Sequence, residues 1–252
     1  MKVVWIASYP KSGNTLVRML LHNYLFGVAN DTDLVAERIP GIHAILAQGT
    51  KLDISFEGKK LVKSHFCFSR QHPYAEATAG FIYIVRNPRD VLRSNARYLG
   101  ATSNKDDFRK FAELFIENMG APRWREMGMG SWNEHLASWL AYTGKVPHYF
   151  VKYEDVRSDT AKILKHLIKF IGLVPEEQNI KTAVESCDIE KARKHELAEK
   201  KSKRTKVYNL LPNNENFVGE GKSGQSLVDI GEDIERLYRK RFGKVATLFN
   251  YD

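Results

Sequence analysis

Cysteine is scarce in this chain, and long apolar runs are missing from it. Its 252 residues contain two cysteines, Cys67 and Cys187, which lie far apart and form no Cys-x-x-Cys pair. This excludes a disulfide framework and a cysteine-based zinc site, and it fits a reducing compartment. No stretch approaches the ~20 apolar residues that a membrane helix needs, and the apolar run within residues 1–8 is too short for a signal peptide. We therefore expect a cytoplasmic protein without a membrane span.

Metal-ligand spacing is missing as well. Apart from His65, which is discussed below, the histidines show no such spacing, and no paired carboxylates resemble a magnesium site. We therefore expect no metal. A hydrophobic content of 43% and a charged content of 27% are typical of a soluble globular protein. The length suits one α/β domain, so we expect a single domain over residues 1–252.

The net charge of +9 favours anionic partners. Charge alone does not distinguish nucleic acid, an acidic membrane surface and a phosphorylated small molecule. Part of the charge falls in a basic run at residues 191–206. A solvated helix face or a mobile loop is the simpler interpretation of such a run.

Patterns typical of strands and of helices alternate along the chain. Strands are predicted at residues 3–8, 60–64, 80–86 and 149–153, and helices after residue 13, from Pro88, and at residues 132–142 and 160–171. This alternation predicts an α/β fold with a mainly parallel central sheet flanked by helices. Ligands of such folds bind at the carboxyl ends of the strands.

The most specific segment is Trp-Ile-Ala-Ser-Tyr-Pro-Lys-Ser-Gly-Asn-Thr-Leu at residues 5–16, a strand and a glycine-containing loop that opens a helix. Backbone N–H groups and the helix dipole favour an anion there, and Lys11 adds a positive charge. Further donors come from the side chains of Ser12, Asn14 and Thr15. The loop is P-loop-like but lacks the Gly-x-x-x-x-Gly-Lys-Ser/Thr spacing of nucleoside-triphosphate binders, which argues against a kinase. The alternative is a surface turn with an incidental lysine.

Residues 9–15 resemble the Tyr-Pro-Lys-Ser/Ala-Gly-x-Thr loop of the PAPS-dependent sulfotransferases, where PAPS is 3′-phosphoadenosine 5′-phosphosulfate. Residues 63–65 are similar to the Lys-Thr-His of that family, and residues 83–90 contain its Arg-Asn-Pro-Lys/Arg-Asp. Residues 151–155 look like its Tyr-Glu-Asp segment. These matches occur in the family's order between residues 3 and about 172. They look closer to bacterial members that act on small molecules or glycopeptides than to the large Golgi enzymes.

Three residues are predicted to carry the chemistry. Sulfuryl transfer needs a cation at the oxygen that bridges to the leaving phosphate and a base at the acceptor hydroxyl. Lys11 and His65 fit these roles, because a neutral imidazole can take the acceptor proton near physiological pH. Lys63, two residues before His65 on an extended segment, would hold the acceptor or the transferring group. The alternative for His65 is a structural histidine.

The resemblance also implies contacts with the nucleotide. Arg86 ends a buried strand and Ser94 lies two helical turns later, where the family binds the 3′-phosphate. The alternative is an ion pair of Arg86 with Asp90 or Asp155. Tyr153 would lie beside the adenine. The alternative is that it belongs to the hydrophobic core, as aromatic residues at strand ends commonly do.

Two departures from the family pattern concern the same nucleotide. The family's adenine-stacking tryptophan is replaced by Leu16, and the C-terminal Arg-Lys-Gly-x-x-Gly-Asp-Trp-Lys motif is reduced to residues 219–225. Gly221 and Lys222 are the candidate replacement for the missing phosphate contact, with a surface loop as the alternative. The predicted co-substrate site is therefore Lys11, Ser12, Gly13, Asn14, Thr15, Leu16, Arg86, Ser94, Tyr153, Gly221 and Lys222.

The function implied is sulfuryl transfer from PAPS to a hydroxyl group of a small molecule or glycoconjugate, releasing 3′,5′-adenosine bisphosphate. The alternatives are a P-loop phosphoryl transferase, which would need magnesium and a nucleoside triphosphate, and a nucleic-acid-binding protein that uses residues 191–206. We expect no nucleic-acid partner, and a homodimer by default. Residues 102–130 are expected to shape the acceptor pocket. Its candidate aromatic lining is Phe66, Phe68, Phe108, Phe115, Trp124 and Trp132, all of which could instead be core.

Overall fold

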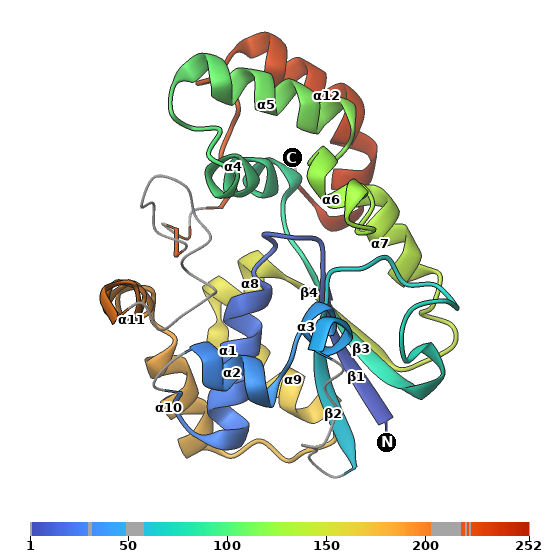
Figure 1. The fold of residues 1–252 in the computed structure, drawn as a ribbon, viewed down its shortest axis with the longest axis vertical. Helices are drawn as coiled ribbons and strands as arrows, with labels where there is room; N and C mark the ends of the chain where they lie inside the picture. Colours follow the sequence, from blue (N-terminus) through green and yellow to red (C-terminus); the bar gives the residue numbers. More distant parts are fainter. Residues whose placement is uncertain are drawn as a thin grey trace.

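The computed structural model describes residues 2–29, 32–48, 58–202, 218, 219, 221 and 223–251. Its centre is a four-stranded parallel sheet with the strand order β2-β1-β3-β4. The strands are β1 (Lys2–Ser8), β2 (Lys59–Ser64), β3 (Thr78–Val85) and β4 (His148–Lys152). All four carboxyl ends therefore lie at one edge of the sheet, as Figure 1 shows.

Helices cover both faces of this sheet (Figure 1), because β1 and β3 are apolar on both sides. One face packs against α1 (Asn14–Phe26), α9 (Thr160–Phe170) and α10 (Glu177–Ser186). The other packs against α4 (Pro88–Tyr98), α5 (Lys105–Glu117), α6 (Pro122–Glu126), α7 (Trp132–Leu140) and α12 (Glu232–Ala246). The remaining helices are α2 (Thr32–Arg38), α3 (Ile42–Gln48), α8 (Tyr153–Ser158), α11 (Ile189–Ser202), η1 (Ala75–Ala77) and η4 (Thr247–Phe249).

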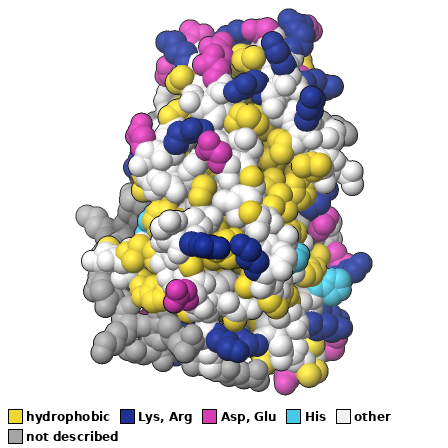
Figure 2. All heavy atoms as spheres, turned by 90° about the vertical axis from the view of Figure 1, so that its right-hand side faces the viewer, with side chains coloured by type: hydrophobic (Ala, Val, Ile, Leu, Met, Phe, Trp, Pro, Cys, Tyr) yellow, Lys and Arg dark blue, Asp and Glu magenta, His cyan; other side chains and the backbone are white. Residues whose placement is uncertain are grey.

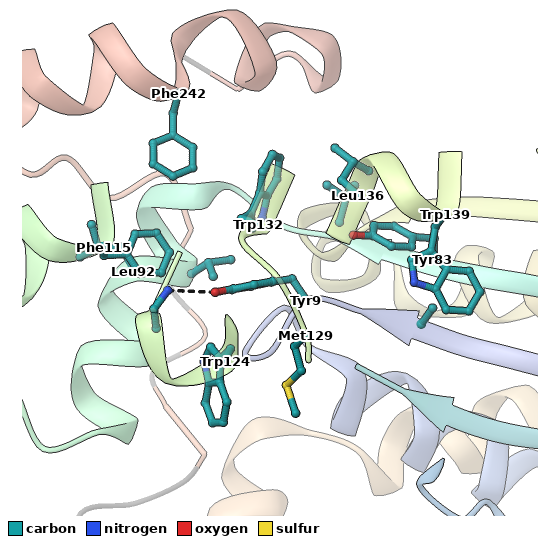
Figure 3. Close-up of a cluster of buried hydrophobic side chains, with 14 of the residues drawn as sticks. Tyr9, Tyr83, Leu92, Phe115, Trp124, Met129, Trp132, Leu136, Trp139 and Phe242 are labelled. Carbon is teal, nitrogen blue, oxygen red and sulfur yellow. Dashed lines mark hydrogen bonds between the residues drawn. The ribbon is translucent and has the colours of Figure 1, made fainter. Parts of the chain in front are cut away.

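The second face carries an aromatic core around Tyr9, the first residue after β1 (Figure 3). The Tyr9 hydroxyl accepts a hydrogen bond from the backbone N–H of Ala121 at 2.9 Å. The Trp124 indole donates to Asn95 of α4 at 2.6 Å. These bonds fix α6 against α4 and against the loop that follows β1, so the loop is anchored on the side away from α1.

The predicted fold class is confirmed, since the sheet is parallel and helices lie on both faces. The predicted aromatic lining is partly wrong: Phe68, Phe115, Trp124 and Trp132 are buried in the core, and only Phe66 and Phe108 keep partial exposure. Apolar side chains of this size are stabilised most by full burial, and the packing of α6 and α7 onto this face of the sheet buries them. The extent of the domain stays a prediction.

Residues 191–202 of the basic run lie in α11, while residues 203–206 lie outside the described part of the chain. One acid of α11, Glu196, is fully buried, so that helix is not solvated on every side. On the face shown in Figure 2, Lys and Arg side chains are interspersed with acidic and hydrophobic ones and do not gather into one basic patch. Within the described residues, no helix has both the length and the apolar character needed to span a bilayer.

Candidate active site

The loop between β1 and α1 has the backbone of an anion-binding turn. Lys11 has a φ of 71° although it is not glycine, and Gly13 has a φ of 98°. A Cβ atom at Gly13 would collide with the ring of Tyr153, the first residue of α8. Glycine is therefore required there both by conformation and by space. The neighbouring Ser12 is 1% exposed, and its hydroxyl has no hydrogen-bond partner among the described residues.

The side chains of Asn14, Thr15 and Leu16, which follow Gly13, differ in their surroundings. The Asn14 amide donates to the backbone oxygen of Ile6 at 3.0 Å and to the Ser8 hydroxyl at 3.2 Å. It therefore holds the loop onto β1, and those donors do not point to a ligand. Thr15 and Leu16 are half-buried in the first turn of α1.

Lys11 is held in a surrounding that disfavours its charge. Its pKa is lowered to about 7, chiefly by burial and then by Arg97, Arg86 and Lys63, while Glu196 acts in the opposite direction. Its ammonium lies 4.3 Å from the centre of the Tyr98 ring. Several cations thus converge on the end of the Lys11 side chain, which is the arrangement an anion would stabilise.

His65 follows β2 directly and is fixed by the neighbouring strand. Its Nδ1 donates to the carbonyl oxygen of Ser8, the last residue of β1, at 2.6 Å. A carbonyl oxygen can only accept, so Nδ1 carries the proton and Nε2 keeps its lone pair. Burial and the adjacent Lys63 hold the pKa of His65 well below its usual value. The imidazole is therefore neutral and can act as a base through Nε2.

Lys63 influences the other two predicted catalytic residues, Lys11 and His65. It is near the carboxyl end of β2, and it lowers the pKa of both Lys11 and His65. Its own pKa is lowered to about 7 by burial and by Arg18 of α1. Because β1 pairs with β2 up to Ala7 and Ser64, Lys11, Lys63 and His65 lie in one neighbourhood at the carboxyl edge of the sheet.

Arg86 leaves β3 toward the same loop. Its guanidinium donates to the carbonyl oxygen of Lys11 at 3.2 Å and lies 4.2 Å from the centre of the Tyr153 ring. The carboxylate of Asp90, a candidate partner for Arg86, accepts hydrogen bonds from the backbone N–H groups of Gly224 and Gln225. Arg86 and Tyr153 therefore border the loop together, and Ser94 is half-buried on α4 nearby in the sequence.

The C-terminal segment approaches this site. Gly221 has a φ of 69°, and a Cβ there would meet Ile189 and the Arg157 guanidinium. Arg193 donates to the carbonyl oxygen of Gly219 at 3.1 Å. Lys222, the predicted phosphate contact, lies outside the described residues. Residues that sequence patterns did not single out are Arg18, His43, Arg97, Tyr98 and Glu196. Of these, Arg97 and Tyr98 had a signal in their spacing, because they lie three and four residues after Ser94 on the same helix.

A cavity of about 430 Å³ lies beside the site. Asn87, Glu154 and Tyr251 are among its lining residues, and none of the predicted site residues that the structure describes is. Glu154 accepts from the backbone N–H of Asn87 and from the Tyr251 hydroxyl. This cavity is therefore distinct from the neighbourhood of Lys11 and His65.

Comparison with known proteins places the chain in a family. The model of the sulfotransferase domain matches residues 2–247. The chain belongs to the sulfotransferase family. Mouse sulfotransferase 4A1 is 25% identical to this sulfotransferase over 264 residues, which are 98% of this chain and 83% of the relative. Mouse sulfotransferase 2A1 is 31% identical over 186 residues, or 69% and 61% of the two chains.

Solved structures share the fold of this sulfotransferase. Mouse sulfotransferase SULT7A1 complexed with PAP aligns with a TM-score of 0.67 and 16% identity over 99% of this chain and 89% of that one. A retinol dehydratase in complex with androsterone and the inactive cofactor PAP aligns with a TM-score of 0.67 and 18% identity, covering 96% and 81%. The predicted family, fold class and enzyme class are confirmed. The roles of individual residues stay predictions.

Proposed function

We propose that this sulfotransferase moves the sulfuryl group of PAPS to a hydroxyl group of a small molecule or glycoconjugate and releases 3′,5′-adenosine bisphosphate. One observation carries the assignment of roles. The Nδ1–H of His65 is bound to the Ser8 carbonyl, which leaves Nε2 as a base in the same neighbourhood as Lys11 and Lys63. Membership of the family supports the reaction class, and relatives of the same fold have been solved with PAP.

In the proposed reaction the acceptor oxygen forms a bond to sulfur while the bond from sulfur to the bridging phosphate oxygen breaks. The acceptor proton passes to Nε2 of His65, and Lys11 stabilises the negative charge that develops on the leaving phosphate. Lys63 holds the acceptor beside His65. The neutral state of His65 suits a base, because a protonated imidazole could not take the proton.

The same proposal assigns the nucleotide contacts. The backbone N–H groups of Gly13, Asn14 and Thr15 surround the 5′-phosphosulfate, and Ser12, whose own N–H donates to the Tyr9 carbonyl oxygen, contributes its unsatisfied hydroxyl. Arg86 and Ser94 bind the 3′-phosphate, and Tyr153 borders the adenine. Gly221 and Lys222 complete the phosphate site from the C-terminal segment. A cytoplasmic location, independence from metal ions and a homodimeric state are the accompanying predictions.

Ligand-induced thermal stabilisation tests this function without knowledge of the acceptor. 3′,5′-Adenosine bisphosphate should raise the melting temperature in the presence of a chelator, because it binds only the folded chain. ATP with magnesium should have little effect. Stabilisation by ATP with magnesium and not by the bisphosphate would point to phosphoryl transfer, and transfer of labelled sulfate from PAPS to a panel of phenols, steroids, sugars and glycopeptides would then confirm or reject the reaction.

A further inference from the structure

Four basic residues lie around the carboxyl end of β2: Arg18 of α1, His43 of α3, Lys63 of β2 and His65, which follows β2. We call them the acceptor-side cluster. The segment that leads into α3 pairs with β2, since the backbone N–H of Lys63 donates to the carbonyl oxygen of Pro40 at 2.8 Å and Gly41 forms a parallel bridge with Lys63. The α3 helix that follows brings His43 beside the Lys63 side chain, and Lys63 accordingly lowers the pKa of His43.

His43 is also next to the predicted base. Its ring lies 4.1 Å from that of Phe66, the residue after His65, and it contributes to lowering the pKa of His65. Phe66 in turn packs toward Gly128, in the loop that follows α6. The Nε2 of His43 is buried and has no hydrogen-bond partner among the described residues. A buried polar atom without a partner is unfavourable, so this position is suited to a ligand.

The acceptor-side cluster lacks compensating negative charge. Within the described residues neither Arg18 nor Lys63 forms an ion pair, and no carboxylate is among the charges that shift the pKa of Arg18, His43 or Lys63. Arg18 donates to the carbonyl oxygen of Ile39 at 2.6 Å, and its Nε is buried without a partner. Cations that are partly removed from water, as Arg18 and Lys63 are, normally have an anionic partner.

The co-substrate does not account for all of this charge. Lys11 marks the proposed position of the leaving phosphate, and it follows β1, which pairs with one edge of β2. His43 follows the segment that pairs with the other edge of β2, and Arg18 donates to Ile39 of that same segment. An anion bound there would belong to the molecule that His65 deprotonates.

We propose that the acceptor is a hydroxyl compound that also carries an anionic group, a carboxylate, sulfate or phosphate, and that His43 and Lys63 bind this group. Here His43 is a specificity-determining residue, with Nε2–H as the donor to the anion. The inference rests on the proposed function, because it uses His65 as the base that fixes the position of the hydroxyl.

Binding of three phenols to the complex with 3′,5′-adenosine bisphosphate tests the proposal without turnover. The phenols are 4-hydroxyphenylacetate, 4-ethylphenol and tyramine, which share a frame and differ in charge. A hydrogen bond to a charged group favours the anionic phenol by about tenfold or more over the neutral one, and tyramine should bind most weakly. Isothermal titration calorimetry gives the dissociation constants.

Variants of His43 separate specificity from a structural role. In His43→Ala the preference for 4-hydroxyphenylacetate over 4-ethylphenol should fall to within about threefold, since the donor is lost. His43→Gln keeps an N–H donor and should retain most of the preference, and His43→Glu should shift it toward tyramine. His148→Ala removes an exposed histidine at the start of β4, at the opposite end of the sheet, and should leave the preference unchanged.

Several results would overturn the inference. These are equal binding of the three phenols, a preference for 4-ethylphenol, failure of all three to bind, or the same ratio in His43→Ala and His43→Glu as in the native chain. Weaker binding of the bisphosphate in His43→Ala, with the phenol ratio unchanged, would assign His43 to the nucleotide instead. Failure of the native chain to bind the bisphosphate at all would reject the proposed function itself, which keeps the two failures apart.

Discussion

At the scale of single residues, burial sets the protonation of the catalytic groups. Removing a cation from water disfavours its charge, and this is the largest contribution to the lowered pKa of Lys11, Lys63 and His65. For the proposed base this is an advantage, because His65 stays neutral. For the lysines it means that full charge returns only when an anion binds beside them.

Replacing His65 with alanine should reduce turnover while leaving the nucleotide site intact. The general base acts in the transition state, so we expect kcat to fall by about 100-fold or more. The dissociation constant for 3′,5′-adenosine bisphosphate should change less than about threefold, since Lys11 and the loop remain. Near-native kcat in His65→Ala would contradict the role of base.

The affinity for 3′,5′-adenosine bisphosphate should depend on pH. The pKa of Lys11 is about 7 in the unliganded chain, and a bound phosphate would raise it, so binding takes up a proton. Affinity should therefore fall as the pH rises from 7 to 9, by up to about tenfold per pH unit for one proton. Calorimetry in buffers of different ionisation enthalpy measures this uptake. In Lys11→Gln the dependence should be shallower, and an unchanged slope would show that another group titrates.

At the scale of elements, the loop between β1 and α1 is shaped by its neighbours as much as by its own residues. Gly13 touches Tyr153 of α8, Tyr9 is bound to the N–H that precedes α6, and the carbonyl oxygen of Lys11 is bound by Arg86 after β3. Three elements from distant parts of the sequence therefore hold the anion-binding backbone in place before any ligand arrives.

Gly13→Ala should damage both stability and binding. The Cβ would collide with Tyr153 in a left-handed conformation, and we expect a loss of about 1–3 kcal/mol in the free energy of unfolding together with weaker nucleotide binding. Gly243→Ala is the matched control. That glycine lies inside α12 with open space around it, so alanine should stabilise the fold by about 0.5–1 kcal/mol. Urea denaturation of both variants gives the values; equal effects would contradict the account.

The sequence was sufficient to predict elements whose signal is local. The strand before Tyr9, the glycine at position 13 and the proline that opens α4 each act within a few residues, and the positions of Lys11, Lys63 and His65 follow from strand ends. His43 could not be found in this way. Its place depends on a bridge between Gly41 and Lys63 that no periodicity in the sequence reveals.

The burial of aromatic residues could not be predicted from the local sequence pattern either. Trp124 lies in the segment 102–130, which suggested a substrate pocket, and Trp132 was counted with it in the aromatic lining of that pocket. Trp124 is buried against Tyr98 and Asn95 of α4, and Trp132 against Phe242 of α12, a helix that packs beside α5, as Figure 1 shows. Such long-range packing is decided by the whole fold and leaves no mark in the segment itself.

At the scale of the whole molecule, an ion pair joins the site to the C-terminal helix. Arg89 of α4 donates to Glu235 of α12 at 2.7 Å, and both side chains are buried. Glu235 also accepts from the backbone N–H of Leu227 at 3.0 Å. Burial alone would raise the pKa of Glu235, but these hydrogen bonds outweigh it and lower the pKa.

Arg89→Ala should destabilise the whole chain. Removing Arg89 leaves the buried Glu235 carboxylate with the exposed Arg239 as its only cationic partner among the described residues, at a cost of about 3 kcal/mol in the free energy of unfolding. The loss should shrink when the chain also carries Glu235→Gln, because the two residues are coupled. The native pair contributes to the free energy of unfolding at neutral pH, and this contribution is lost as the pH falls and Glu235 becomes protonated. A loss below about 1 kcal/mol in urea denaturation would show that the pair is not a major link.

The claim on which the rest depends is that Lys11 and His65 serve one reaction. A crystal structure with 3′,5′-adenosine bisphosphate and 4-hydroxyphenylacetate tests it most directly. The account predicts the 5′-phosphate at the Lys11 ammonium and the phenol hydroxyl at Nε2 of His65, with the site of the missing sulfuryl group between them. A nucleotide bound away from the loop after β1, or an imidazole that faces away from the phenol, would contradict it.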